Sequence, residues 1–111
     1  MKIFNAKKAI IETEKLRNYV LSPTHPTGRF KAAFFRELGY SVENWNVFEQ
    51  HLREQILLLN AVKVEESGYG QKFVIEGPMT GPTGKTVQVV TVWVILKGES
   101  FPRFITAYPK G

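Results

Sequence analysis

The sequence predicts an α+β domain in which about three N-terminal helices pack on a four-stranded antiparallel sheet arranged as a meander. Up to about residue 60, apolar residues recur at the three- and four-residue spacing of amphipathic helices. Beyond residue 60, apolar residues alternate or run together between turns rich in glycine and proline, which is typical of strands. A run of helices followed by a run of strands favours helices packed on one sheet face.

The length allows one hydrophobic core, so we expect residues 1–111 to form a single domain. Residues 1–12 have no clean period, and we expect them to pack on the core as a short strand or as a lead-in. Three helices are then expected, at about residues 13–22, 29–38 and 44–60. Pro23 ends the first, because the residue before a proline disfavours helical geometry, and Gly39 suits the position after the second.

Four strands are expected after the helices, at residues 61–66, 71–76, 85–96 and 103–108. The first two alternate apolar and polar residues around a Gly-Tyr-Gly turn, which predicts a hairpin. The third has Val, Thr, Trp or Ile at nearly every position, which favours a central place in the sheet.

The charge favours an anionic partner. There are 15 Lys and Arg against 10 Asp and Glu, which gives a net charge of +5 at pH 7. Such a surplus suits a nucleic acid such as RNA, although a charge kept away from zero also serves solubility alone.

The residue types exclude several kinds of site and anchor. The chain has no cysteine, which rules out disulfides and thiolate chemistry, and its two histidines lack metal-binding spacing, so we expect no metal or cofactor. No apolar run approaches the about 20 residues of a membrane span, and no signal-peptide core is present, so no membrane partner is expected. We expect a cytoplasmic protein as an isolated chain, or a module delivered as part of a larger secreted protein.

The loop and helix start at residues 22–31 contain the best candidates for chemistry. A helix that begins near Gly28 offers free backbone N–H groups, and Arg29 and Lys31 add positive charge there, which suits a phosphate. His25 can titrate near neutral pH. The plain alternative is a structural histidine with solvated basic residues.

The last strand offers hydroxyl groups that could complete such a site. Thr106 and Tyr108 fall on one face, shared with Phe104, because strand side chains alternate. If this strand lies under the helices, both hydroxyls would stand beside the helix start, as donors to a phosphate. The alternative is that Thr-Ala-Tyr-Pro is simply good strand sequence.

These two stretches also carry a family resemblance. The sequence resembles a bacterial family of uncharacterised domains in its ordered motifs, which are His25-Pro-x-Gly28 with Lys31-Ala32, and Thr106-Ala-Tyr-Pro109. It is similar to the barnase, EndoU, colicin and RelE-type ribonuclease superfamily, whose members set N-terminal helices against a four-stranded antiparallel sheet. Members often serve as toxins in bacterial conflict.

The resemblance implies a metal-independent endoribonuclease in which the ribose 2′-OH attacks the adjacent phosphate. It makes His25 the general acid or base, Lys31 the group that stabilises phosphorane charge, and Thr106 and Tyr108 the groups that orient the phosphate. Arg29 and Arg103 are weaker phosphate candidates. No second well-placed histidine exists, which leaves Lys31 or Tyr108 to complete the acid/base pair.

Two other functions stay open at this point. One is a non-catalytic module that binds nucleic acid or protein, and the other is an accessory domain in which the same motifs serve the fold. A toxin would imply an immunity or antitoxin protein as a partner. The sequence leaves the oligomeric state undetermined.

Overall fold

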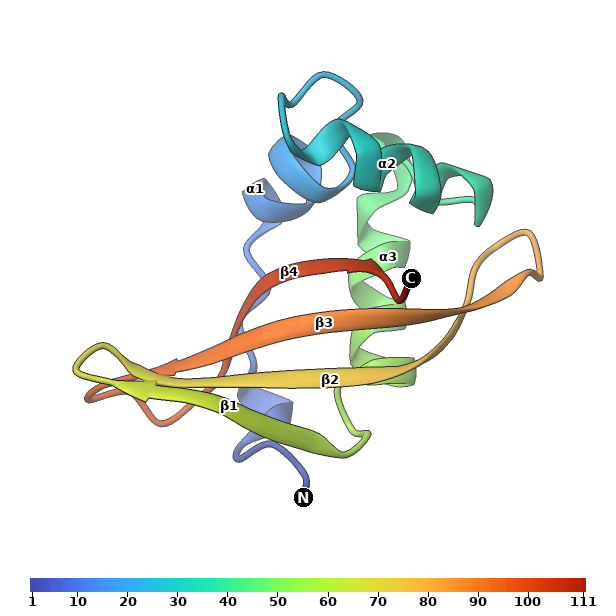
Figure 1. The fold of residues 1–111 in the computed structure, drawn as a ribbon. Coiled ribbons are helices and arrows are strands. Elements are labelled where there is room, and N and C mark those ends of the chain that lie inside the picture. Colours follow the sequence, from blue (N-terminus) through green and yellow to red (C-terminus); the bar gives the residue numbers. More distant parts are fainter.

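The computed structural model describes all residues from Met1 to Gly111 and shows an α+β domain (Figure 1). The helical elements are η1 (Ala6–Lys8), α1 (Thr13–Lys15), η2 (Leu16–Val20), α2 (Gly28–Glu37), η3 (Val42–Asn44), α3 (Trp45–His51) and η4 (Leu52–Ile56). The strands are β1 (Ala61–Ser67), β2 (Gly70–Thr80), β3 (Thr86–Leu96) and β4 (Arg103–Pro109). Two of the helices, η2 and η4, are π-helical and directly continue α1 and α3.

The four strands form one sheet in the order β1-β2-β3-β4, and all neighbours are antiparallel. The β2–β3 pair is the longest, running from Gly70 opposite Leu96 to Thr80 opposite Thr86. The β3–β4 pair contains a bulge, where the register shifts between Val92 and Trp93. A bulge places an extra residue in one strand and changes which face the following side chains occupy.

The predicted fold was wrong at the start of the chain and at the border of the sheet. The helices that pack on the sheet are not N-terminal, because residues 1–12 precede them and bridge to the sheet region at Lys2–Asn60 and at Ile10–Arg103. The second bridge is parallel, and it is made by the Ile10 N–H to Pro102 O and by the Phe104 N–H to Ile10 O. The edge of β4 that faces away from β3 therefore has Ile10 as a parallel neighbour, so β4 is not a free edge strand at that point.

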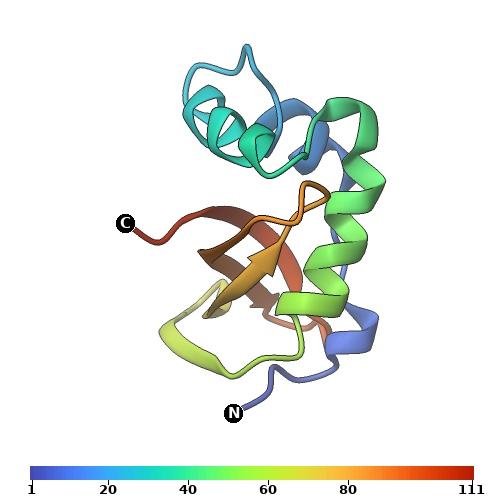
Figure 2. The ribbon, with the colours of Figure 1, turned by 90° about the vertical axis from the view of Figure 1, so that its right-hand side faces the viewer.

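The prediction that all the helices pack on one sheet face was also wrong. Figure 2 shows α3 standing against one face of the sheet, whereas α1 and α2 lie above its β4 edge. Residue contacts agree, because η4 meets β2 and α2 meets β4. The helical part is thus split into a face-covering helix, α3 with η4, and an edge-covering pair, η2 with α2.

The core lies between the sheet and the α3–η4 helix. Its largest members are fully buried: Trp93, Phe104, Phe35, Phe48 and Tyr40. The rings of Trp93 and Phe104 meet edge to face with centroids 5.3 Å apart. Burying side chains of this size contributes about 1.5–3 kcal/mol each. This core holds β4 firmly in place beneath α2.

Candidate active site

The close contact between α2 and η2 sets the geometry of the site. A Cβ atom built on Gly28 would lie 2.1 Å from the backbone oxygen of Tyr19, a distance that no real side chain tolerates. Glycine is therefore required at this position, because only a residue without a Cβ atom allows this close approach. Because α2 starts directly on Tyr19, the next turn of the helix brings Lys31 to the Tyr19 side chain.

His25 closes the N-terminus of α2 with its own ring. Its Nδ1 atom accepts hydrogen bonds from the backbone N–H groups of Thr27 and Gly28, both at 3.0 Å. Since Nδ1 is the acceptor, the proton of the neutral ring sits on Nε2. The backbone oxygen of His25 accepts a third bond from the Arg29 N–H at 3.0 Å. These donors were expected to face an anion, and here they are satisfied within the loop.

Lys31 is the centre of the site and joins three elements. Its Nζ atom donates hydrogen bonds to Tyr19 Oη of η2 and to Thr106 Oγ1 of β4, the latter at 3.1 Å. The same nitrogen lies 4.5 Å from the ring centroid of Tyr19 and 6.0 Å from that of Tyr108. The Tyr19 ring in turn meets the His25 ring edge-on at 4.9 Å. We call Tyr19, His25, Lys31, Thr106 and Tyr108 the Lys31 cluster.

The Lys31 cluster contains a cation that has no carboxylate partner. All seven ion pairs of the protein lie elsewhere, and Lys31 has no carboxylate within 4.0 Å. Its two hydrogen-bond partners are side-chain oxygens, and an ammonium group has three N–H donors, so one donor remains for a ligand. Both Tyr19 and Lys31 are half-buried, which strengthens charge interactions relative to open water.

This environment lowers the pKa of the Tyr19 phenol. The hydrogen bond from Lys31 is the main reason why the pKa of Tyr19 lies below its usual value of 10.0. Burial opposes this shift, while the hydroxyls of Thr106 and Thr27 and the charge of Lys31 add to it. The cluster thus combines a cation with a phenol whose ionised form is stabilised.

The last strand presents its two hydroxyls on the outer sheet face. Thr106 pairs with Val92 and Tyr108 with Val90, so both side chains point away from α3. Phe104 does not share this face, contrary to the expected alternation, and is 1% exposed in the core. The bulge at Val92 and Trp93 shifts the alternation between Phe104 and Thr106.

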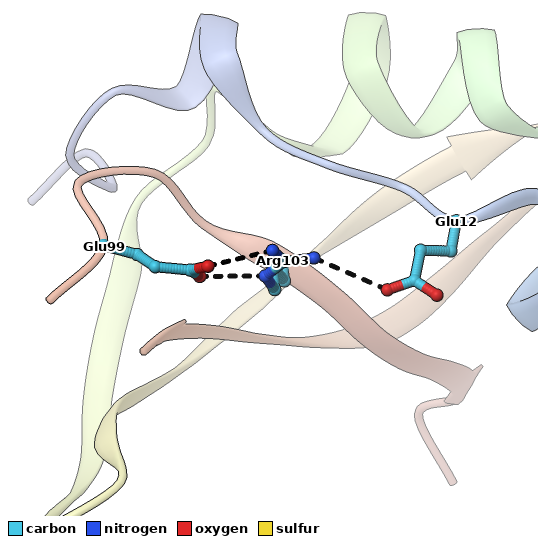
Figure 3. A network of polar contacts seen from close by, with 3 residues as sticks. All are labelled: Glu12, Glu99 and Arg103. Atoms are coloured by element: carbon cyan, nitrogen blue, oxygen red, sulfur yellow. Dashed lines mark hydrogen bonds and ion pairs between the residues drawn. The ribbon is translucent and has the colours of Figure 1, made fainter. Parts of the chain in front are cut away.

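Two arginines of the predicted site lie outside the cluster. The Arg29 guanidinium lies 4.7 Å from the centroid of the exposed Phe30 ring. Arg103 donates from Nε and Nη2 to the two carboxylate oxygens of Glu99, at 2.8 and 2.9 Å, and its Nη1 lies 3.5 Å from Glu12 (Figure 3). This pairing lowers the pKa of the Glu99 carboxyl and leaves Arg103 neutralised by its neighbours.

Tyr19 is the member of the cluster that sequence reasoning missed. The helical period placed it on an apolar face with Leu16 and Val20, both of which are buried. The contact that makes Tyr19 special reaches Lys31, twelve residues away, and depends on the glycine at the start of α2. The only local signal was a hydroxyl on an otherwise apolar face.

Groups of three or more His, Asp or Glu side chains that could together hold a metal ion do not occur in the structure. None of its helices has the length and apolar character needed to cross a lipid bilayer.

Comparison with known proteins gives a fold and a family. No curated protein matches the chain. Among solved structures, it is similar to a chain of a contact-dependent growth inhibition toxin–immunity protein complex from Klebsiella pneumoniae 342, with 23% identity and a TM-score of 0.68. The match covers 91% of this chain and 99% of the other. A family model described as a domain of unknown function, DUF6883, matches residues 2–111, and the chain therefore belongs to this family.

Proposed function

We propose that the chain is a metal-independent endoribonuclease of the bacterial toxin type, with the Lys31 cluster as its active site. The observation that carries the proposal is the position of Lys31. Its ammonium group lies between hydroxyls from two other elements, has no carboxylate partner and retains an unused N–H donor. A group of this kind fits the negative charge of a phosphodiester and of the transition state formed from it.

In the proposed reaction, the ribose 2′-oxygen attacks the adjacent phosphorus. A bond forms between O2′ and phosphorus, and the bond from phosphorus to O5′ breaks. The 2′-OH proton passes to a base and O5′ receives a proton, which leaves a 2′,3′-cyclic phosphate and a 5′-hydroxyl. Lys31 stabilises the negative charge on the phosphoryl oxygens, and the hydroxyls of Thr106 and Tyr108 orient the group.

His25 has a narrower role in this proposal than the resemblance implied. Its Nδ1 accepts two backbone N–H bonds, so it accepts a proton only if the cap on α2 breaks. We propose that His25 positions the loop and the Tyr19 ring, and that its Nε2–H is available as a donor to the substrate. Gly28 contributes by close packing, and Arg29 offers an exposed charge nearby on the same helix.

The fold comparison supports the toxin part of the proposal. The similar chain comes from a toxin–immunity protein complex, and the sequence motifs resemble the ribonuclease toxin superfamily. We propose that the chain acts on RNA in a bacterial cytoplasm, which it could reach as part of a larger secreted protein. The partner expected for such a toxin is an immunity or antitoxin protein.

A second function is favoured by the outer face of the sheet. Val62 and Val64 of β1 are 63% and 54% exposed, and with Val74, Val90 and Tyr108 they line a depression of about 430 Å³. Exposed apolar groups gathered on one face suit a protein contact. A non-catalytic module that binds a protein or a nucleic acid is therefore the alternative.

Incubation with RNA in the presence of a chelator separates the two functions. We expect wild-type protein to cleave RNA, and Lys31→Ala to lose cleavage. Lys97→Ala, in the exposed β3–β4 turn, is the matched control for loss of one positive charge and should retain it. RNA binding without cleavage by the wild type would favour the binding module, and equal cleavage by Lys31→Ala would overturn the proposed site.

A further inference from the structure

The proposed reaction needs a base that takes the 2′-OH proton. The contacts within the Lys31 cluster exclude most of its residues from that role. Nδ1 of His25 is engaged by two backbone N–H groups, and a neutral histidine already carries a proton on Nε2. Thr106 has an aliphatic hydroxyl, which does not ionise in the working range of an enzyme. Tyr108 lies 6.0 Å from the Lys31 nitrogen and has no hydrogen bond to it. Among the cluster's groups that can ionise, only Tyr19 has its oxygen hydrogen-bonded directly to the Lys31 ammonium group.

We propose that Tyr19 is the general base of the cleavage reaction and that Lys31 is the general acid, an inference that rests on the proposed ribonuclease function. The two atoms concerned, Tyr19 Oη and Lys31 Nζ, are directly hydrogen-bonded. The bond joins a residue of η2 to a residue of α2, and the contact of Gly28 with the Tyr19 backbone fixes the two helices against each other.

The proton balance closes within this pair. The Tyr19 phenolate takes the proton from the 2′-OH as the O2′–phosphorus bond forms. The Lys31 ammonium gives a proton to O5′ as the phosphorus–O5′ bond breaks. The proton on Tyr19 then returns to the Lys31 amine across their hydrogen bond, so the pair regains its starting state without any other reactant.

The surroundings of Tyr19 favour its ionised form. The titratable groups around it are Lys31 from α2, His25 from the preceding loop and, beyond Lys31, Tyr108 from β4. No carboxylate is among them, so no negative charge opposes the phenolate. The pKa of Tyr19 is accordingly below its ordinary 10.0, chiefly because of the Lys31 hydrogen bond. A base is most effective when its pKa lies near the working pH, so this shift is in the useful direction.

The first arm of the test needs no activity. Spectrophotometric titration follows phenolate formation by the tyrosines Tyr19, Tyr40, Tyr69 and Tyr108. We expect the earliest ionisation of the wild type to be absent in Tyr19→Phe and to move to higher pH in Lys31→Met. Tyr69→Phe, at the 84% exposed turn position, is the matched control and should keep the early step. An early step that survives in Tyr19→Phe would overturn the inference.

The second arm measures cleavage of RNA against pH in the presence of a chelator. Loss of a general base costs about 10²- to 10⁴-fold, so we expect Tyr19→Phe to fall by that factor and to lose the rise of rate with pH. Tyr69→Phe should cleave like the wild type. If the wild type cleaves and Tyr19→Phe cleaves equally well, this inference fails while the proposed function stands. If the wild type does not cleave RNA, the proposed function fails and the catalytic assignment fails with it, whatever the titration shows.

Discussion

Lys31 and Arg103 both tie β4 to helical or N-terminal parts of the chain, yet their partners have opposite electrostatic consequences. Arg103 meets the carboxylates of Glu99 and Glu12, so its charge is cancelled. Lys31 donates hydrogen bonds to the side-chain oxygens of Tyr19 and Thr106 and has no carboxylate partner. A cation held by carboxylates serves the fold, whereas a cation held by hydroxyls stays available to an anion. The type of partner, not the type of basic residue, separates the two sites.

The largest expected effect comes from removing the charge of Lys31. Removing one group that stabilises transition-state charge costs about 10²- to 10³-fold in rate, so we expect Lys31→Met to lower RNA cleavage by at least that factor. The melting temperature should change little, because the methionine chain can fill the space of the lysine stem. Initial rates on a labelled RNA measure the effect. A cleavage rate within twofold of wild type would place the chemistry elsewhere.

The next effect tests the contact that brings the Lys31 cluster together. Gly28→Ala puts a methyl group against the Tyr19 backbone oxygen, so α2 must move away from η2. Overpacking of this kind costs about 1–3 kcal/mol in the free energy of unfolding, measured by denaturant titration. We expect cleavage to fall as well, because Lys31 moves away from Tyr19. Gly68→Ala, in a turn where an added Cβ meets nothing within 4 Å, is the control.

His25 should act through the loop that presents the cluster. Removal of a helix cap typically costs about 0.5–2 kcal/mol, so we expect His25→Ala to lower the free energy of unfolding by that amount. His25→Asn keeps an acceptor near the same N–H groups and should recover part of the loss. Thermal unfolding of the two variants measures the difference. Equal stability of His25→Ala and wild type would show that the ring does not cap α2.

Tyr19 and Tyr40 have pKa values that are shifted in opposite directions, so their effects can be separated by varying the pH. Lys31 lowers the pKa of Tyr19, whereas burial raises the pKa of Tyr40, which is 1% exposed. A raised pKa in the folded state stabilises the protein below the unfolded value, here 10.0, and this contribution is lost as the pH rises above it. We expect stability to fall above pH 10. In Tyr40→Phe the decline should be shallower, and an equal decline would contradict this assignment.

The smallest effect on activity is expected at Arg103. Arg103→Met removes the bonds to Glu99 and Glu12, so we expect a modest decrease in melting temperature. Cleavage should be unchanged, because these partners take no part in the Lys31 cluster. Differential scanning fluorimetry and the same RNA assay measure both quantities. A large loss of cleavage in a folded Arg103→Met protein would erase the distinction between the two cations.

Local patterns predicted the parts of this molecule that depend on neighbours in sequence. A helix at about residues 29–38, four strand segments and the shared face of Thr106 and Tyr108 follow from period and turn chemistry. The structure places that helix at Gly28–Glu37 and extends the second strand to Thr80, beyond the expected 71–76. The grouping of Lys31 with Thr106 was a conditional expectation, because it required β4 to lie beneath α2. The edge-on placement of α2 meets that condition.

The rest depended on contacts that no local pattern encodes. A bulge opposite Val92 and Trp93 turned Phe104 into the core. The alternation of apolar and polar residues in the sequence does not reveal where such a bulge lies. The extended N-terminal segment owes its position to a bridge between Ile10 and Arg103, far apart in the chain. The spacing of Tyr19 with Leu16 and Val20 is typical of a core residue, and its hydrogen bond with Lys31 is visible only in the three-dimensional structure. Long-range pairing therefore decided the contacts of Lys31 with Tyr19 and Thr106, and the contact of Arg103 with Glu12.

The most direct test of the central claim is the chemical nature of the 3′ ends left on RNA by the wild-type protein in a chelator. Attack by the 2′-OH at the Lys31 cluster predicts 2′,3′-cyclic phosphate ends, and an RNA methylated at the 2′-oxygen should stay intact. Mass spectrometry of the fragments distinguishes the possibilities. Intact RNA, or fragments that end in a 3′-hydroxyl, would contradict the account.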